Sequence, residues 1–133
     1  MKILIVVVGL FILFEGTWLY QKKPLEQSIA HGEEIYQDFC IQCHLDTGEG
    51  VSGVFPPLAK SDYLVNNTEM SIRGIKFGMS GPIVVNGEEY NGVMQDQGLD
   101  DVEIADVMNY ILNNWGNKFN GMITEEQVDN INE

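Results

Sequence analysis

The sequence predicts a mostly α-helical domain with long ordered loops and a small β-hairpin. Residues 100–115 carry apolar side chains at the spacing of one helix face, and residues 28–41 form a second, less regular helical pattern. Stretches rich in Gly and Pro lie between them and are typical of loops. A chain of 133 residues with 44% hydrophobic residues is sufficient for one packed domain, but such long loops need a further group to pack on.

Residues 1–23 are expected to be a signal anchor or a cleavable export signal. A lysine precedes an unbroken run of apolar residues and glycine at positions 3–14. This run is short for a membrane span, which takes about 20 apolar residues. Trp18 and Tyr20 extend it, and no small-residue cleavage site follows, so the anchor is favoured. Two lysines at the end of the segment argue against the anchor, because positive charge prefers the cytoplasmic side.

Residues 24–27 are expected to form a short linker, and residues 28–133 an exported domain on the periplasmic side of a bacterial cytoplasmic membrane. From residue 24 onward the chain has four basic and 19 acidic residues, a net charge of −15. Nucleic-acid binding is excluded as a leading function, because phosphate contacts need clusters of Lys and Arg. The charge keeps the domain soluble and is suited to steering it toward a partner with a basic docking surface.

The first helix of the domain is expected to run from about Ser28, a suitable N-cap, to Ile41. Gly32 interrupts its apolar stripe and costs about 1 kcal/mol relative to a good helix former. Another element is therefore expected to pass close to this glycine. His31, which precedes it, is interpreted as a surface residue of the helix.

The middle of the chain is expected to hold a loop, two short helices and a hairpin. Residues 45–57 are the loop, and residues 58–76 hold the helical segments, separated at 66–68, with Thr68 capping the second. Residues 83–90 place an Asn-Gly pair between two short β-prone runs, which is the pattern of a two-residue hairpin turn.

Two further helix starts are marked by capping boxes. Asp100, with a glutamate three residues later, begins the amphipathic helix, whose apolar face reaches Trp115 and which Gly116 ends. Thr124, with a glutamine three residues later, predicts a last short helix.

The chemistry of the chain is expected at residues 40–44, which read Cys-Ile-Gln-Cys-His. This C-x-x-C-H pattern is the attachment signature of c-type haem. The thiols of Cys40 and Cys43, one helical turn apart, can reach the vinyl groups of one porphyrin, and the imidazole of His44 then ligates the iron. A thioredoxin-like dithiol would need βαβ surroundings, and a zinc site would need further Cys or His, of which only His31 remains. The expected cofactor is therefore one covalent haem c.

A second axial ligand has to come from elsewhere in the chain, and methionine sulfur is suitable. The candidates are Met70, Met79, Met94, Met108 and Met122. Met108 lies on the apolar face of a helix, Met70 lies within an expected helix, and Met122 lies in the C-terminal tail. Met79 and Met94 lie in loop regions, where a side chain can be aimed at an iron.

Taken in order, these motifs resemble the class I (monohaem) cytochrome c family of bacteria. The resemblance extends over residues 29–133. It rests on the C-x-x-C-H motif, on Phe-Pro-Pro-Leu-Ala at 55–59, on Gly-Pro-Ile-Val-Val-Asn-Gly at 81–87, on Tyr-Asn-Gly-Val-Met at 90–94, and on the helix that ends in Trp-Gly-Asn. It implies a cytochrome c-like fold, with helices around one covalently bound haem.

The resemblance also implies the distal ligand. In this family a Met in the Asn-Gly-x-Met position ligates the iron, which corresponds to Met94 here, with Met79 as the alternative. The family often has Pro after this Met, whereas this chain has Gln95.

Further residues around the haem are implied by the same resemblance. A prolyl carbonyl accepts a hydrogen bond from Nδ1 of the ligand His, and Pro56 matches this position best, with Pro57 as the alternative. Leu58 is expected beside the haem. Gly32 is expected to pack against Tyr110 of the C-terminal helix.

The expected function is one-electron transfer in an exported electron-transfer chain, without catalytic residues, because both axial positions of the iron are filled. Two alternatives stay open. One is an electron-entry subunit fixed in a larger respiratory or dehydrogenase complex, and the other is a ligand-binding or peroxidase-like haem protein from which Met94 dissociates. The expected partners are redox proteins and, through the N-terminal segment, the membrane. No nucleic acid and no small-molecule substrate is expected.

Overall fold

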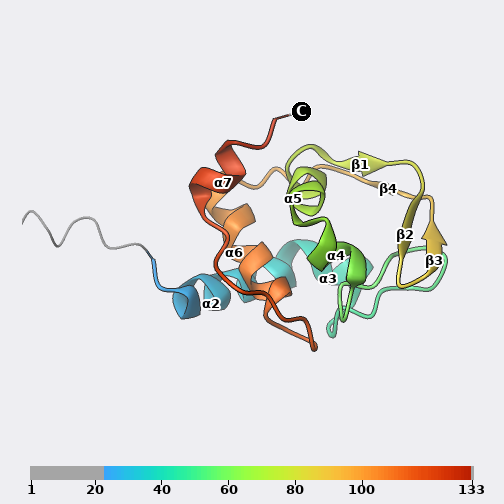
Figure 1. Cartoon of the computed structure of the whole chain (residues 1–133), viewed down its shortest axis with the longest axis horizontal. Helices are drawn as coiled ribbons and strands as arrows, with labels where there is room; N and C mark the ends of the chain where they lie inside the picture. Colours follow the sequence, from blue (N-terminus) through green and yellow to red (C-terminus); the bar gives the residue numbers. More distant parts are fainter. Residues whose placement is uncertain (1–22, 133) are drawn as a thin grey trace, which may run out of the picture.

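The computed structural model describes residues 23–132. They form a mostly helical domain, as the sequence predicts, with two small β-ladders, one of which is the predicted hairpin (Figure 1). Residues 1–22, most of the expected export segment, lie outside the described residues. Within residues 23–132, no helix is long and apolar enough to cross a membrane. The helical elements are α2 (Leu25–Ile35), a π-helical turn (Tyr36–Cys40), α3 (Ile41–His44), α4 (Asp62–Asn66), α5 (Thr68–Phe77), α6 (Asp101–Leu112) and α7 (Glu125–Asp129).

The first helix, α2, begins at Leu25, three residues before the predicted start at Ser28. Pro24 occupies the N-cap, which is favourable because the first N–H groups of a helix have no partner inside it. Ser28 is fully buried, and its hydroxyl donates to Oδ1 of Asp106 at 2.6 Å instead of capping the helix. The prediction of a linker at residues 24–27 is therefore wrong for all but its first residue.

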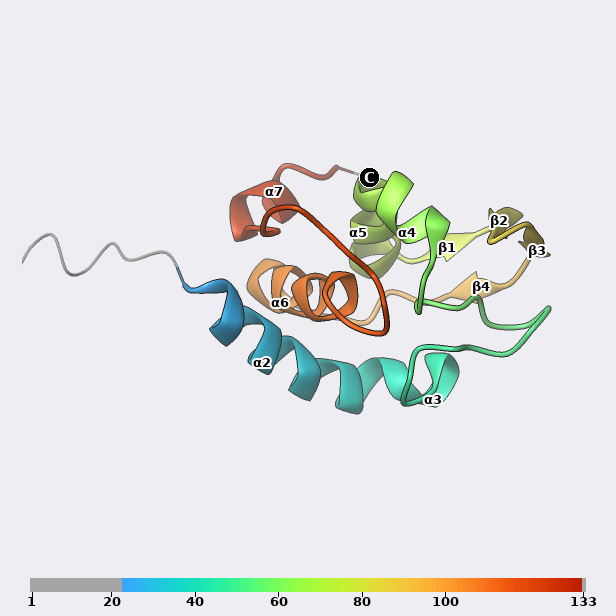
Figure 2. The same cartoon turned by 60° about the horizontal axis from the view of Figure 1, so that its bottom comes forward.

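The main contact of the fold is the packing of α2 across α6 (Figure 2). A Cβ atom at Gly32 would lie 2.0 Å from the carbonyl oxygen of Asp106 and 2.8 Å from Cβ of Tyr110. Only glycine allows so close an approach, which explains the residue that is unfavourable for the helix itself. The expected close passage of another element at Gly32 is confirmed.

The core surrounds α6, on which α5 and α7 also pack. This helix ends at Leu112, so the prediction that it reaches Trp115 is wrong. Trp115 has a φ of 52° and lies against Gly48, where an added Cβ would be 2.5 Å from its ring. The helix ends early because the side-chain amides of Asn113 and Asn114 donate to carbonyls of its last turn.

Both predicted capping boxes are present. Asp100 and Glu103 exchange side-chain and backbone hydrogen bonds at 2.9 Å each, and Thr124 begins α7 in the same way. The prediction for Thr68 is wrong, because its hydroxyl donates back to carbonyls of α4. Ser61 is the cap that the sequence pattern did not reveal, and it accepts from the backbone N–H of Leu64 at the start of α4.

The predicted hairpin is formed by β2 (Ile83–Val85) and β3 (Glu88–Tyr90). Asn86 and Gly87 both have positive φ, 52° and 82°, as a two-residue hairpin turn requires. A second ladder, which was not predicted, joins β1 (Met79–Ser80) to β4 (Val93–Met94). Residues 79–94 thus form one long loop. The β1–β4 ladder joins its two ends, and the β2–β3 hairpin lies in its middle.

Candidate functional site

The first component of the site is His44, the last residue of α3 and a buried side chain. Its Nδ1 lies 3.0 Å from the carbonyl oxygen of Pro56, whereas Pro57, the alternative, makes no such contact. Because a carbonyl can only accept, Nδ1 carries the proton and Nε2 keeps its lone pair. Burial lowers the pKa of His44, and the hydrogen bond to Pro56 opposes this only in part. The imidazole is therefore held neutral, with a free nitrogen.

The two cysteines lie shortly before this histidine, and they are not joined to each other in a disulfide. Cys40 ends the π-helical turn and is half-buried, whereas Cys43 is exposed on α3. Burial, reinforced by Cys43, raises the pKa of Cys40 to about 12. A redox dithiol needs the opposite shift, because the thiolate is its reactive form. Within residues 23–132 there is also no group of three His, Cys, Asp or Glu side chains that could hold a metal ion by itself.

These residues line two adjoining cavities of about 270 and 70 Å³. The larger cavity includes Cys43 in its wall and the smaller one Cys40. Five residues line both cavities: His44, Pro56, Met79, Ile83 and Met94. The two cavities therefore meet between the histidine and the two methionines.

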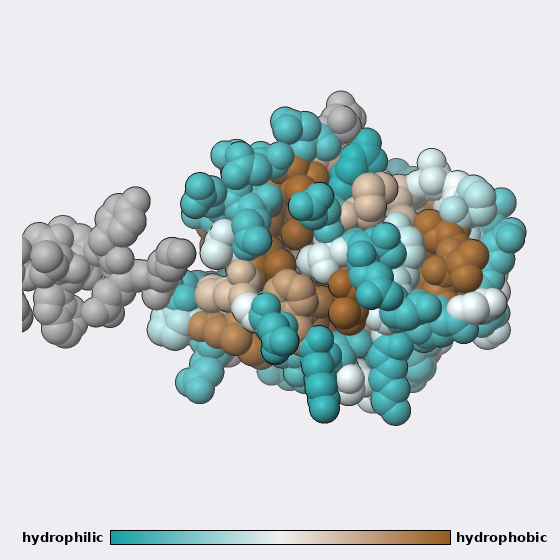
Figure 3. All heavy atoms as spheres, viewed as in Figure 1, coloured by the Kyte–Doolittle hydropathy of each residue, from teal (hydrophilic) through white to brown (hydrophobic). Residues whose placement is uncertain are grey.

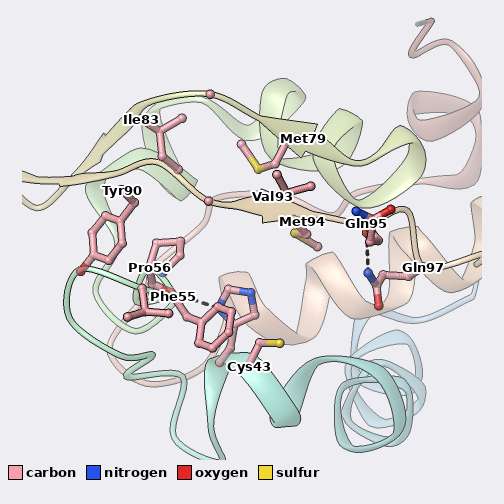
Figure 4. Close-up of a pocket in the computed structure, with 14 residues that line it drawn as sticks. Cys43, Phe55, Pro56, Met79, Ile83, Tyr90, Val93, Met94, Gln95 and Gln97 are labelled. Carbon is pink, nitrogen blue, oxygen red and sulfur yellow. Dashed lines mark hydrogen bonds between the residues drawn. The ribbon is translucent and has the colours of Figure 1, made fainter.

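The methionines reach the cavities from the β-strands. Met79 and Met94 are directly paired across the β1–β4 ladder, and both side chains line both cavities. In Figure 4 they lie on one side of the larger cavity, while Cys43 lies on the other. Of the remaining candidates, Met70 is 49% exposed on α5, and Met122 lines a different cavity beside α6. Met108 is fully buried in the core and reaches only the smaller cavity.

The cavity walls fit a haem, which is a large apolar plane with two axial positions. Pro56, Pro57 and Leu58 form one apolar wall of the smaller cavity. None of the residues that line either cavity is an Asp, Glu, Lys or Arg, although the domain carries many acids. Thiols at one edge, an imidazole on one side and thioethers on the other are the donor set that a c-type haem requires. His31 is 59% exposed on α2, where its Nδ1 lies 3.1 Å from Nζ of Lys23 and 3.5 Å from the carboxylate of Asp106, away from these cavities.

Asn117 is a site-supporting residue that the sequence pattern did not single out. Its side chain is buried, and its amide donates to the carbonyl of Leu58 at 2.8 Å and to that of Ile111 at 2.9 Å. Its oxygen accepts from the backbone N–H of Ser61 at 3.2 Å. These bonds hold residues 58–61, part of which lines the smaller cavity, against the end of α6. In the sequence, only its position directly after Gly116 at the helix end distinguished Asn117, and this position does not predict its hydrogen-bond partners.

Several known proteins are similar to this chain in sequence. The cytochrome c family matches residues 29–115. Cytochrome c-552 of Thermus thermophilus is 41% identical over 111 residues, which are 80% of this chain and 69% of that protein. The cytochrome c subunit of a quinone alcohol dehydrogenase of Gluconobacter oxydans is 29% identical over 107 residues, which are 75% of this chain but 21% of that subunit. The chain therefore belongs to the cytochrome c family, binds haem c covalently and transfers electrons.

Proposed function

We propose that the chain is a one-electron carrier whose haem is attached through Cys40 and Cys43 and ligated by His44 and Met94. The observation that carries this assignment is the convergence of these four side chains on one pair of adjoining cavities. The haem iron supplies the one-electron chemistry when it is bound, and a thioether ligand favours its reduced state. With His44 and Met94 both bound to the iron, no coordination position would remain for a substrate.

The protein residues hold and shield the cofactor. The carbonyl of Pro56, 3.0 Å from Nδ1 of His44, fixes the ring and increases its basicity. Leu58 and its proline neighbours exclude water from one wall. Membership of the cytochrome c family supports a carrier and not an enzyme.

Two thioethers face the cavities, and packing favours Met94 as the ligand. The sulfur of Met79 lies only 3.0 Å from the place that a Cβ atom of Gly74 would take, so it is turned toward α5. Met94 comes from the opposite strand, β4, which Asn91 and Gly92 connect to β3. We assign Met94 as the distal ligand, and Met79 as an apolar part of the wall.

Removal of the thiols tests the attachment. In protein matured by a host that attaches haem c, Cys40→Ala/Cys43→Ala is expected to carry no covalent haem, because each thioether bond needs its own sulfur. Mass measurement under denaturing conditions gives the readout. His31→Ala is the control and is expected to keep the haem, because this side chain is exposed and away from the cavities. Covalent haem on the double variant would contradict the attachment.

Substitution of the methionines tests the ligand. Met94→Ala is expected to lose the optical signature of thioether-ligated iron and to bind carbon monoxide readily at neutral pH, because the sixth position opens. Met79→Leu, the matched control on the paired strand, is expected to keep the signature. The reverse result would make Met79 the ligand. A wild-type protein that already binds carbon monoxide readily would instead support the ligand-binding alternative.

We further propose that the domain lies on the periplasmic side of the membrane, tethered by residues 1–23. The apolar run at residues 3–14 and the family membership support this location. A permanent place in a larger complex is the second candidate, since one relative is the cytochrome c subunit of an alcohol dehydrogenase.

Cell fractionation separates these possibilities. The full chain is expected in the membrane fraction, and residues 24–133 behind a cleavable export signal are expected in the soluble periplasmic fraction with their haem. After mild detergent extraction, the full chain is expected to migrate alone. Co-migration with a large complex would favour the fixed subunit, and a soluble full chain would contradict the tether.

The redox partner is proposed to carry a basic docking surface. Residues 24–133 have a net charge of −15, and apolar side chains are exposed at the end of the molecule that carries the β-strands (Figure 3). Two of these side chains line neither cavity: Val84 of β2 is 56% exposed, and Val51 is 41% exposed. The acidic surface attracts a basic partner protein over a long range, and the exposed apolar side chains then pack against that partner and exclude water.

Small redox reagents of opposite charge test whether the acidic charge of the domain steers redox partners toward it. Oxidation of the reduced protein by a cationic metal complex is expected to slow as salt is added, and oxidation by an anionic complex is expected to accelerate, because salt screens attraction and repulsion alike. Stopped-flow rates over a range of ionic strength give the readout. Rates that do not depend on salt for either reagent would remove electrostatic steering.

A further inference from the structure

We propose that Tyr36 is a positioning residue for His44: its hydroxyl holds the strained peptide next to His44 and so sets the orientation of the imidazole. The inference rests on the proposed role of His44 as an iron ligand. It starts from Leu45, which comes directly after His44 and has a φ of 62° and a ψ of 172°. This backbone region is essentially restricted to glycine, because the Cβ atom of any other residue is crowded there. Surrounding contacts must therefore hold Leu45 in place.

The principal contact on this peptide is the phenol of Tyr36. Its hydroxyl donates to the carbonyl oxygen of Leu45 at 2.6 Å, whereas the backbone N–H of Gly48 approaches the same oxygen only at 3.3 Å. The Tyr36 side chain is fully buried, with ring centroids 5.5 Å from Tyr110 and 4.9 Å from Trp115. Packing of the aromatic ring thus fixes the position of the Tyr36 hydroxyl independently of its hydrogen bond to Leu45. Burial also raises the pKa of Tyr36, so the phenol keeps its proton.

The chain between Tyr36 and His44 makes this reach possible. The carbonyl of Tyr36 accepts the N–H of Ile41, five residues on, so the helix widens into a π turn that ends at Cys40. Such a turn contains one more residue than an α-helical turn and changes the direction of the side chains beyond it. The helical run ends where the N–H of Leu45 donates to the carbonyl of Ile41 at 2.9 Å.

The held peptide is coupled to the imidazole by short connections. The carbonyl of His44 accepts the N–H of Gly50 at 3.0 Å, and Nδ1 of His44 donates to Pro56 at 3.0 Å. Without the phenol hydroxyl, the peptide of Leu45 is free to rotate toward a less crowded conformation and to carry the His44 backbone with it. The Nδ1–H···O bond then lengthens, and the imidazole becomes a weaker donor to iron. A weaker donor stabilises the oxidised iron less and raises the potential.

The test uses the holoprotein and removes one oxygen atom. Tyr36→Phe is expected to remain low-spin, to raise the midpoint potential and to move the paramagnetically shifted NMR signals of the His44 ring. Tyr110→Phe is the matched control, because it removes a hydroxyl from the same aromatic cluster that makes no side-chain hydrogen bond among residues 23–132. Equal shifts in both variants would overturn the proposal, since they would reflect general loosening of the cluster.

A second experiment repeats Tyr36→Phe in a Leu45→Gly variant, and it distinguishes a positioning role of Tyr36 from a purely structural one. Leu45→Gly relieves the strain, because glycine adopts positive φ freely. In that background Tyr36→Phe is expected to leave the potential and the ring signals unchanged. A shift as large as in the wild type would overturn the proposal. If the wild-type protein shows no shifted His44 ring signals at all, it is the ligand assignment that fails, and that outcome is distinct from an unresponsive Tyr36→Phe.

Discussion

The close approach of α2 to α6 at Gly32 is the constraint on which the rest of the structure depends. A Cβ atom there would lie 2.0 Å from the carbonyl oxygen of Asp106, so the two backbones touch without an intervening side chain. Helical runs are stiff, and one point of close contact therefore fixes the position of the helical residues beyond it. Four residues later Tyr36 enters the core, and twelve residues later His44 reaches the cavity wall.

A buried polar cluster stabilises the same crossing. The carboxylate of Asp106 accepts from Ser28 at 2.6 Å and pairs with Lys23. Asn109 donates to Ser28 and to the carbonyl of Ile123, and it accepts from the backbone N–H of Ile123. A buried carboxylate is costly unless its partners are in place, so a slipped arrangement of α2 would leave it unsatisfied. The cluster thus favours one register of α2, α6 and the segment before α7.

How much of this fold can be predicted from sequence depends on how local each signal is. The capping box at Asp100 and the Asn86-Gly87 turn were predicted correctly, because their donors and acceptors lie within four residues of one another. Ser28 and Trp115 were misassigned, because each has its partner in a distant element, Asp106 in one case and Gly48 in the other. The β1–β4 ladder was missed for the same reason, since two-residue strands carry no periodicity.

The same distinction divides the site. The histidine side is set by neighbouring residues, since C-x-x-C-H fixes thiols and imidazole within one helical run that packs firmly on α6. The methionine side depends on chain closure between residues 79 and 94, which brings two thioethers to directly paired positions. Sequence order alone therefore left Met79 and Met94 as alternatives. The family resemblance points to Met94, and the packing of the Met79 sulfur toward Gly74 favours the same choice. The β1–β4 ladder pairs two residues on each strand, whereas His44 is held by the bond from its Nδ1 to Pro56 and by the bond from the N–H of Gly50 to its carbonyl. The cavity wall that carries Met79 and Met94 is thus less firmly held than the wall that carries His44.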